Sequence, residues 1–321
     1  MQPSYDLIII GGGAAGLAAA QYGARANLRT LLVEQMANGG QCLLIEGLEN
    51  YPGFPDPIDG EEFTERFERQ ARRFGAEFAI ATVEGIRKEG EIFHLDTSEG
   101  ALTAYSVVLA TGARHRTLDV PGEAELQGRG VSYCATCDGP FFKNRRILVV
   151  GGGDAACDEA TFLSKLTDKV VMVHRRDRFR AQKSLAQRVL NNENIDVRFN
   201  TVVREIHGKP GMMGMQKVGG VTFQDTVTGE EYTEELDAVF VFIGSIPQTD
   251  LVPFVDKDDA GYIVTDEHME TSTPGLYAVG DVRTTPFRQL VVAASDGAIA
   301  AHSASQYIDA LLDRSYAAAP A

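Results

Sequence analysis

The chain has 321 residues, of which 44% are hydrophobic and 23% charged, a composition typical of a globular protein with roughly two domains. Its formal net charge of −15 disfavours a nucleic-acid partner, because a phosphate backbone repels an acidic surface. No run of about 18 apolar residues predicts a membrane span, and four cysteines are too few for a disulfide scaffold, so we expect a reducing, cytoplasmic compartment.

The N-terminal stretch DLIIIGGGAAGLAAA reads as a buried strand, a glycine-rich turn and an alanine-rich helix. Gly11, Gly13 and Gly16 fit the G-x-G-x-x-G pattern, which makes a tight turn and lets a pyrophosphate approach the backbone. The next strand, RTLLVE, ends at Glu34, and an acid there binds both ribose hydroxyls of an adenosine and repels a 2′-phosphate. The stretch therefore predicts a site for FAD, in preference to NAD, with an ordinary glycine-rich turn as the structural alternative.

A second fingerprint of this kind lies in RRILVVGGGDAACDEA. Gly151, Gly153 and Ala156 fit the G-x-G-x-x-A variant, which again follows an apolar strand and opens a helix. The chain is therefore expected to bind two dinucleotides.

The strand after the second fingerprint ends at His174, in the position that Glu34 occupies after the first. The acid is replaced there by a basic group, since Arg175 and Arg176 follow directly and Arg180 comes a turn later. Guanidinium groups suit a phosphate dianion in geometry and in charge. This group predicts an NADP site, and a solvated surface turn is the alternative.

Two further strand-end turns are candidates for flavin contacts. VVLATGAR brings Ala110, Thr111 and Gly112 to the end of a strand, and GLYAVGDV does the same for Gly280 and Asp281. An acid at the second turn could bond a ribityl hydroxyl. Neither turn is specific alone, so each indicates a flavin contact only in combination with the first fingerprint, and a plain strand-end turn is the alternative.

The order of these motifs predicts an α/β protein with two Rossmann-like domains of the three-layer ββα type. We expect a discontinuous FAD domain, 1–115 and 248–321, and an inserted NADPH domain, 116–247, that carries the cysteine pair. The junctions TGARHRT and IGSIPQT are short and rich in turn residues, so the inserted domain could rotate about them.

The segment SYCATCDGPFF holds Cys134 and Cys137 with Asp138 directly behind them. Zinc binding by C-x-x-C normally needs a second pair or suitably spaced histidines, and Cys42 and Cys157 are single and distant in sequence. A structural staple across so short a loop adds little constraint. A redox dithiol remains, because C-x-x-C lowers the pKa of the attacking thiol and closes rapidly.

These motifs give the chain a clear resemblance to one family. It resembles the low-molecular-weight, bacterial-type thioredoxin reductases, which are class II pyridine nucleotide-disulfide oxidoreductases, across essentially its whole length. The matching motifs are GGGAAG, GGQ at 39–41, ENYPGF at 49–54, ATGA, CATCDG, GGGDAACDEA, HRRDRFRA and GDVRTTPFRQ at 280–289.

The resemblance implies NADPH-dependent reduction of thioredoxin, with electrons passing from NADPH to FAD, then to the cysteine pair and then to the partner disulfide. It implies that Cys137 lies next to the flavin, that Cys134 exchanges with the partner, and that Asp138 is the acid. It also implies rotation of the NADPH domain between half-reactions, and a homodimer.

The resemblance assigns the cofactor contacts as well, and no metal ligands are expected. The residues expected to line FAD are Gly11, Gly13, Ala14, Ala15, Gly16, Glu34, Gln35, Gly40, Gln41, Cys42, Asn50, Val83, Ala110, Thr111, Gly112, Gly280, Asp281, Arg288, Gln289 and Leu290. The residues expected to line NADPH are Gly151, Gly153, Asp154, Ala155, His174, Arg175, Arg176, Arg180, Ile243 and Gly244.

Three alternatives remain beside this hypothesis. A flavin oxidase or ferredoxin-type reductase would usually lack the C-x-x-C pair, and a redox sensor would be expected to lose a cysteine or Asp138. The same flavin and dithiol chemistry could also serve another acceptor, a glutaredoxin-like protein or a peroxidase. Cys42 is expected to be a packed apolar residue, with an oxidation-sensitive accessory thiol as the alternative.

Overall fold

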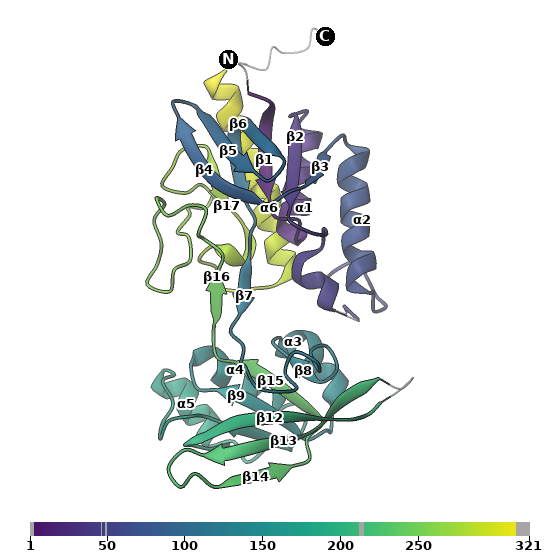
Figure 1. The fold of residues 1–321 in the computed structure, drawn as a ribbon, viewed down its shortest axis with the longest axis vertical. Helices are drawn as coiled ribbons and strands as arrows, with labels where there is room; N and C mark the ends of the chain where they lie inside the picture. The colour runs from purple at the N-terminus through teal and green to yellow at the C-terminus, as the bar shows by residue number, and fades with distance from the viewer. Residues whose placement is uncertain (1–2, 46, 49, 212–214, 313–321) are drawn as a thin grey trace. The chain divides into compact units, whose positions relative to one another are not determined.

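The computed structural model describes residues 3–45, 47–48, 50–211 and 215–312. The chain divides into two compact units. Unit 1 consists of Met1–Arg114 with Ile246–Ala321, and unit 2 is the continuous segment His115–Ser245, which carries the teal and green elements from β8 to β15 in Figure 1.

The two segments that join the units pair with each other. Strands β7 (Ala113–His115) and β16 (Ser245–Pro247) form a two-stranded sheet. The unit boundaries therefore fall within this pair of strands, one residue and two residues before the junctions expected from the sequence.

Unit 1 is built on a mixed sheet with the strand order β3-β2-β1-β6-β5-β4, and β17 pairs with β6. Its strands are β1 (Tyr5–Ile10), β2 (Thr30–Glu34), β3 (Glu77–Ile80), β4 (Val83–Glu89), β5 (Ile92–Thr97), β6 (Gly100–Leu109) and β17 (Leu276–Ala278). Its α-helices are α1 (Ala14–Arg25), α2 (Gly60–Arg73) and α6 (Leu290–Leu311).

Strand β6 belongs to both parts of this sheet. Its first half pairs antiparallel with β5, and its second half pairs parallel with β1. Strand β1 reads YDLIII and is buried at every residue after Tyr5, the pattern of a strand covered on both faces. The parallel strands thus bring the ends of β1, β2, β6 and β17 to one edge, where the predicted turns follow.

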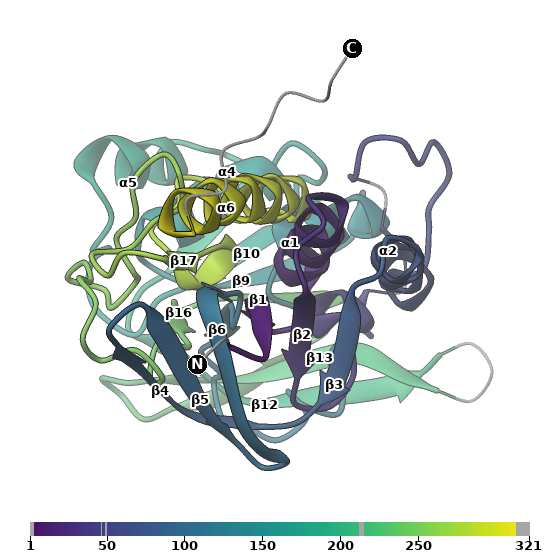
Figure 2. The same cartoon turned by 90° about the horizontal axis from the view of Figure 1, so that it is seen from above.

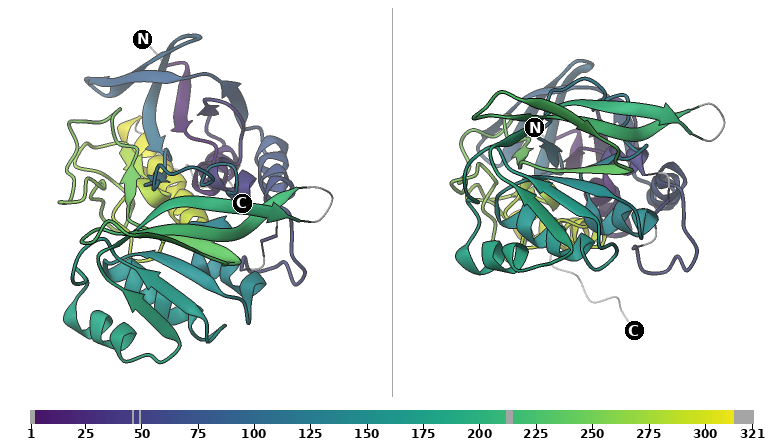
Figure 3. Two further views of the ribbon diagram at one scale, coloured as in Figure 1. Left: turned by 60° about the horizontal axis from the view of Figure 1, so that its bottom comes forward. Right: turned by 90° about the horizontal axis from the view of Figure 1, so that it is seen from below.

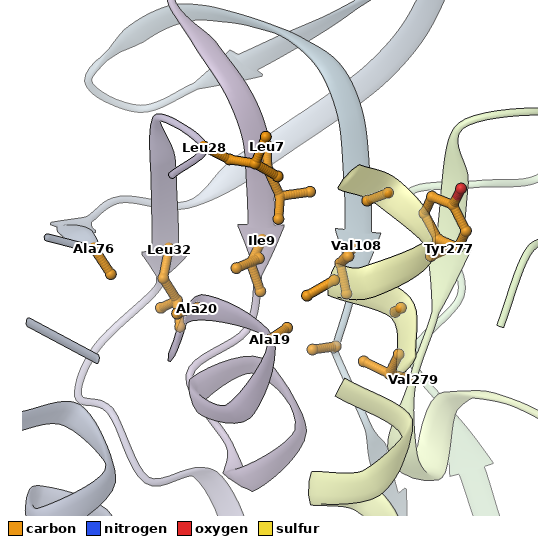
Figure 4. Close-up of a cluster of buried hydrophobic side chains, with 14 of the residues drawn as sticks. Leu7, Ile9, Ala19, Ala20, Leu28, Leu32, Ala76, Val108, Tyr277 and Val279 are labelled. Carbon is orange, nitrogen blue, oxygen red and sulfur yellow. The ribbon is translucent and has the colours of Figure 1, made fainter. Parts of the chain in front are cut away.

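Helices α1 and α6 lie side by side over one face of the parallel strands (Figure 2). They approach closely, because a Cβ on Gly297 would lie 2.1 Å from the carbonyl oxygen of Ala15. Figure 4 shows Leu7, Ile9 and Val108 in the core of this layer, all three without solvent exposure. Each such buried side chain contributes about 1.5–3 kcal/mol, so this layer holds the first glycine-rich turn firmly in place.

Unit 2 contains a parallel sheet of order β11-β10-β9-β15-β8 and a separate antiparallel sheet of order β12-β13-β14. Its strands are β8 (Val131–Ser132), β9 (Ile147–Gly151), β10 (Val170–Val173), β11 (Ile195–Arg198), β12 (Thr201–Pro210), β13 (Gln216–Asp225), β14 (Glu231–Glu234) and β15 (Ala238–Phe242). Its α-helices are α3 (Ala135–Asp138), α4 (Asp154–Leu163) and α5 (Lys183–Leu190).

Two apolar cores make unit 2 a three-layer structure. One core joins the parallel sheet to the antiparallel sheet and contains Val150 and Phe223, and the other joins the parallel sheet to the helices and contains Val149 and Cys157. Figure 3 shows the long green β12–β13 hairpin of this unit. The predicted α/β class is confirmed. Among the described helices, none is both long and apolar enough to cross a bilayer.

Candidate dinucleotide and dithiol sites

Two glycines of the first fingerprint are required by close backbone contacts. Gly11 has a φ of 107°, and a Cβ there would lie 2.4 Å from the carbonyl oxygen of Ala110 at the end of β6. A Cβ on Gly16 would lie 1.9 Å from the carbonyl oxygen of Gly11. The turn is therefore packed tightly against both its own helix and the neighbouring strand.

Gly13, the remaining fingerprint glycine, faces open space instead. A Cβ on Gly13 would meet no atom within 4 Å, and this residue caps α1 without any side-chain hydrogen bond. The backbone N–H groups of the first turn of α1 thus lack an internal acceptor at a place where no protein atom fills the space beside Gly13. This is the shape and polarity that a pyrophosphate fits. Gly40 borders the same space, since its Cβ would lie 3.3 Å from Cα of Gly13.

The carboxylate of Glu34 is fixed beside this turn by backbone donors. One oxygen accepts the N–H of Gly12 at 2.7 Å, and the other accepts the N–H groups of Gln35 at 2.8 Å and Met36 at 3.2 Å. These bonds hold the acid at the end of β2, where the sequence predicted a ribose-binding group.

The second fingerprint repeats this construction in unit 2. Gly151 has a φ of 157°, and a Cβ there would lie 2.4 Å from the carbonyl oxygen of Phe242 and 2.6 Å from Cβ of Ala156. Gly153 caps α4 without a side-chain hydrogen bond, and its Cβ would again meet no atom within 4 Å. The two open helix N-termini are therefore equivalent.

Two buried polar atoms mark the same position in each fingerprint. Among the described residues, Asn38 Oδ1 and His174 Nε2 are the buried side-chain polar atoms without a hydrogen-bond partner. A Cβ on Gly12 would lie 2.3 Å from Asn38 Oδ1, and a Cβ on Gly152 would lie 2.3 Å from His174 Nδ1. Each side chain therefore lies against the middle glycine of its turn. Buried polar groups are normally paired, so both turns fit an added ligand.

His174 and the arginines after it form a basic cluster. Burial lowers the pKa of His174, and the positive charges of Arg180, Arg175 and Arg176 lower it further, against a backbone hydrogen bond with Gly151 that raises it. The three arginines are exposed, and the described part of the chain offers none of them an acidic partner in an ion pair. Unpaired guanidinium groups beside a fingerprint turn fit a phosphate group.

The Gly280–Asp281 turn lies at the start of a short 3-10 helix, Gly280–Val282. Burial raises the pKa of the Asp281 carboxyl group, Arg288 opposes this shift, and the charge of Asp296 adds to it. Gly280 has a φ of 69°, and its Cβ would lie 3.2 Å from Cβ of Ala15 in α1. The turn thus lies against the first fingerprint helix, as a shared site requires.

An ion pair that the sequence analysis did not identify holds this turn. Asp296 Oδ2 accepts the N–H of Gly280 at 3.1 Å and a hydrogen bond from Arg283 Nη1 at 3.2 Å. Both side chains are nearly buried, with 13% of Arg283 and 7% of Asp296 exposed. A lone acid within the apolar stretch AASDGAIAA was the signal that could have pointed to it.

Hydrogen bonds join distant predicted flavin residues within unit 1. Asn50 Nδ2 donates to Gln289 Oε1 at 2.9 Å, and Gln41 Nε2 donates to the carbonyl oxygen of Ala113 at 2.5 Å. Thr111 Oγ1 donates to the carbonyl oxygen of Gln248 at 2.6 Å. These bonds tie the segments that carry Gln41, Asn50 and Thr111 to other segments of unit 1.

The remaining predicted residues occupy less distinctive positions. Cys42 is buried beside Ala14, and burial raises the pKa of its thiol to about 12. Val83 packs against the apolar core that contains Ile8. The others are placed as follows: Ala15 is buried in α1, Gly112 has a φ of 66°, Leu290 begins α6, Asp154 accepts the N–H of Gln182 at 2.7 Å, Ala155 is exposed, and Ile243 and Gly244 follow β15.

The cysteine pair is a disulfide in unit 2. Cys134 and Cys137 are bonded through their sulfur atoms, with their Cα atoms 5.3 Å apart. Helix α3 begins directly after Cys134, whose Sγ accepts the N–H of Cys137 at 3.2 Å and whose carbonyl oxygen accepts the N–H of Asp138 at 3.1 Å. All three residues are half-buried, so the disulfide is accessible and the carboxyl group of Asp138 belongs to the same turn.

The other two thiols do not join this site. Cys42 and Cys157 are both free and buried, and burial raises the pKa of Cys157 to about 11. The described residues contain no group of three or more His, Cys, Asp or Glu side chains arranged for a metal ion. Among the described cysteines, Cys134 and Cys137 are therefore the two that are partly exposed to solvent.

Curated relatives are similar to the chain along nearly its whole length. The thioredoxin reductase of Treponema pallidum is 55% identical over 311 residues, which cover 97% of this chain and 99% of the relative. The thioredoxin reductase of Bacillus subtilis is 44% identical over 310 residues, which cover 96% of each chain.

Solved structures are similar in fold as well. The crystal structure of thioredoxin reductase from Streptococcus pyogenes superposes with a TM-score of 0.89 at 41% identity, covering 95% of this chain and 98% of that one. The Lactococcus lactis thioredoxin reductase in its FR conformation gives a TM-score of 0.65 at 40% identity, covering 95% and 99%.

The family comparison agrees with the two fingerprints and the disulfide. Residues 5–297 match the profile of the pyridine nucleotide-disulphide oxidoreductases. This match spans both units and includes every predicted site residue. The chain is an oxidoreductase and belongs to the pyridine nucleotide-disulphide oxidoreductase family.

Proposed function

We propose that the protein reduces the disulfide of thioredoxin with NADPH, and that the electrons travel by way of FAD and the Cys134–Cys137 disulfide. In the net reaction NADPH and one proton are consumed, the two sulfurs of thioredoxin become thiols, and NADP⁺ is released. The names and near-complete coverage of the relatives support this activity.

The observation that carries the proposal is the accessible disulfide in the same unit as the basic fingerprint turn. Cys134 and Cys137 lie in unit 2, which also holds Gly153 and Arg175. A disulfide that opens and closes during turnover must be reachable, and the half-burial of both cysteines meets this condition. In this proposal Cys137 lies next to the flavin, Cys134 attacks the partner disulfide, and Asp138 supplies the proton to the departing sulfur.

The two fingerprint turns differ in the cofactor that they fit. Glu34 would hold the adenosine ribose of FAD in unit 1, and its negative charge would repel a 2′-phosphate. In unit 2, His174, Arg175 and Arg176 would hold the 2′-phosphate of NADPH. A bound flavin supplies two-electron exchange between a nicotinamide and a disulfide. In this proposal the residues of the chain bind and orient the cofactors, and Asp138 supplies the proton.

We also propose that unit 2 rotates between half-reactions. The linkers are short and paired as β7 and β16, which limits the motion to a hinge. Two solved relatives of nearly equal identity, 41% and 40%, give TM-scores of 0.89 and 0.65. This spread at constant identity supports a family in which the arrangement of the units varies. A cytoplasmic homodimer completes the proposal, on the basis of the resemblance.

The decisive experiment follows anaerobic NADPH consumption by FAD-loaded protein, with oxidised thioredoxin as the sole acceptor. The Cys134→Ser variant removes one sulfur of the disulfide, and the matched Cys157→Ala variant removes a buried thiol of the same unit. We expect turnover in the wild type and in Cys157→Ala, and none in Cys134→Ser.

Other results would redirect the assignment. Flavin reduction by NADPH without turnover would contradict thioredoxin as the acceptor, and glutaredoxin-like proteins and peroxidases would then be assayed in its place. Undiminished turnover by Cys134→Ser would contradict the proposed electron path. Sedimentation of the loaded protein tests the dimer.

A further inference from the structure

The segment from Ser132 to Cys134 is held together by hydrogen bonds. Ser132, which is 5% exposed, brackets Cys134, because its Oγ accepts the N–H of Cys134 at 3.1 Å and donates to the carbonyl oxygen of Cys134 at 3.2 Å. Between these two residues stands Tyr133, which is half-buried and follows strand β8. Cys134 is therefore hydrogen-bonded to Ser132 and joined through its own peptide bond to Tyr133.

The ring of Tyr133 is anchored at its face and at its hydroxyl. Its face stacks on the ring of His115, with the two centroids 5.0 Å apart and the planes inclined by 9°. Its hydroxyl donates to Glu123 Oε1 at 2.9 Å. Burial raises the pKa of the Tyr133 phenol, and the bond to Glu123 raises it further, so the hydroxyl stays protonated and remains a donor.

Glu123 connects this ring to the segment that follows the first linker. Its side chain is 3% exposed and accepts the N–H of Leu118 at 2.9 Å, the N–H of Asp119 at 2.9 Å and the hydroxyl of Tyr133. Asp119 has a φ of 57°, a left-handed conformation that needs such support in a non-glycine residue. A buried carboxylate with three donors makes a rigid junction.

The stacking partner lies in the linker itself. His115 is the last residue of β7 and the first residue of unit 2. Tyr133 therefore touches the linker strand through His115, touches the segment after it through Glu123, and is bonded covalently to Cys134. Tyr133, His115 and Glu123 belong neither to the disulfide nor to either fingerprint turn.

We propose that Tyr133 and Glu123 are positioning residues that tie the Cys134–Cys137 pair to the linker and thereby favour the closed disulfide over the open dithiol. A disulfide forms more readily when its two sulfurs are held near each other, and a loosely held Cys134 would meet Cys137 less often. This inference rests on the proposed role of the cysteine pair and adds the groups that set its redox equilibrium.

The test measures that equilibrium without NADPH or thioredoxin. The FAD-loaded full-length protein is equilibrated anaerobically in mixtures of reduced and oxidised glutathione, then alkylated, and the peptide holding both cysteines is quantified by mass spectrometry. In this exchange the Cys134–Cys137 disulfide takes two electrons and two protons from two glutathione thiols, giving one dithiol and one glutathione disulfide. Tyr133→Phe keeps the ring and its stacking but removes the bond to Glu123.

Tyr232→Phe is the matched control, because the Tyr232 hydroxyl also takes part in a hydrogen bond in unit 2, with Arg198 at 3.4 Å. We expect Tyr133→Phe to shift the equilibrium toward the dithiol by about fivefold or more, the scale of one ordinary hydrogen bond, and the control to match the wild type. A further variant, Tyr133→Leu, also removes the stacking on His115 and should shift it more.

The result that overturns the proposal is an equilibrium in Tyr133→Phe and Tyr133→Leu that equals that of Tyr232→Phe, with both variants folded by circular dichroism. A purely structural role would lower the melting temperature and leave the glutathione equilibrium unchanged. Failure of the wild type to reduce thioredoxin would overturn the proposed function and leave this measurement intact, so the two failures are distinguishable.

Discussion

Asp296, in the first half of α6, pairs with Arg283 at 3.2 Å and holds the N–H of Gly280 at the same time. The pair is nearly buried, so its two charges depend on each other for stabilisation. It fixes the turn that carries Asp281 against the helix of the first fingerprint. The carboxyl group of Asp296 thus supports the proposed flavin site by holding the Gly280–Asp281 turn.

Replacing Asp296 by Asn is expected to lower the free energy of unfolding by about 3 kcal/mol, because Arg283 is left as a nearly buried charge without its partner. The release of FAD should accelerate as well, since the Gly280–Asp281 turn loses an anchor. Chemical denaturation and the rate of flavin release measure the two effects.

The matched control is Glu62→Gln in the exposed pair with Arg66, at 2.6 Å on the surface of α2. An exposed pair at this spacing contributes about 0.3–0.5 kcal/mol, so this variant should stay near the wild type. An equal decrease in the free energy of unfolding of both variants would show that the buried pair stabilises the protein no more than the exposed pair does.

The glycines of the second fingerprint should separate folding from nucleotide binding. In Gly153→Ala the new methyl group meets no protein atom, so the free energy of unfolding should stay within about 0.5 kcal/mol of wild type. The methyl group would instead occupy the space proposed for the pyrophosphate, so the KM for NADPH should rise at least about tenfold. Thermal unfolding and steady-state kinetics of the FAD-loaded protein provide both values.

Gly151→Ala is the complementary variant, because its Cβ would lie 2.4 Å from the carbonyl oxygen of Phe242. It should lose stability by about 1–3 kcal/mol through backbone strain. If Gly153→Ala were the less stable of the two, the space beside Gly153 would not be open in the folded protein.

The arginine cluster predicts the cofactor preference. Changing Arg175 and Arg176 together to Gln should raise the KM for NADPH by at least about tenfold and change the KM for NADH much less, because charge-assisted bonds to the 2′-phosphate are lost. Steady-state kinetics with both nucleotides measure the ratio. Arg178→Gln, an exposed arginine of the same turn, is the control. An equal effect on both nucleotides would show that the arginines do not bind the phosphate.

The strand-turn-helix segments of this fold could be predicted because the residues that specify each of them are contiguous in sequence. The stretch from β1 to α1 carries its apolar strand, its turn glycines and its helix within a few residues of one another, and the second fingerprint repeats it. The correspondence of Glu34 and His174 follows from equal spacing, and the structure places both beside the middle glycine of their turns. The disulfide of Cys134 with Cys137 needed only a short loop.

The supporting contacts could not be predicted because they depend on how distant segments pack. The bond from Asn50 to Gln289 joins residues 239 positions apart, and no local pattern specifies it. The pairing of Asp296 with Arg283 requires α6 to dock with one particular face toward the Gly280 turn. Packing of this kind is a property of the assembled core, so a single sequence offers only an isolated buried charge as its signal.

Cys42 gives a last prediction, because burial raises the pKa of its thiol to about 12, with a smaller contribution from Asp281. In the unfolded chain the pKa of this thiol is about 8.5. Folding therefore keeps the proton bound, and the stability that this contributes is full below about pH 8.5 and is lost as pH rises toward the folded pKa. In denaturation experiments, the free energy of unfolding of the Cys42→Ala variant should fall less at alkaline pH than that of the wild type.

The reactivity of Cys42 provides a separate measurement. At pH 8 the native thiol should react with iodoacetamide at least about a hundredfold more slowly than an exposed cysteine, because very little thiolate is present. Labelling of the protein with and without FAD distinguishes a packed residue from an oxidation-sensitive one: equal, slow labelling supports packing, and rapid labelling only after FAD removal would show an accessory thiol that the cofactor protects.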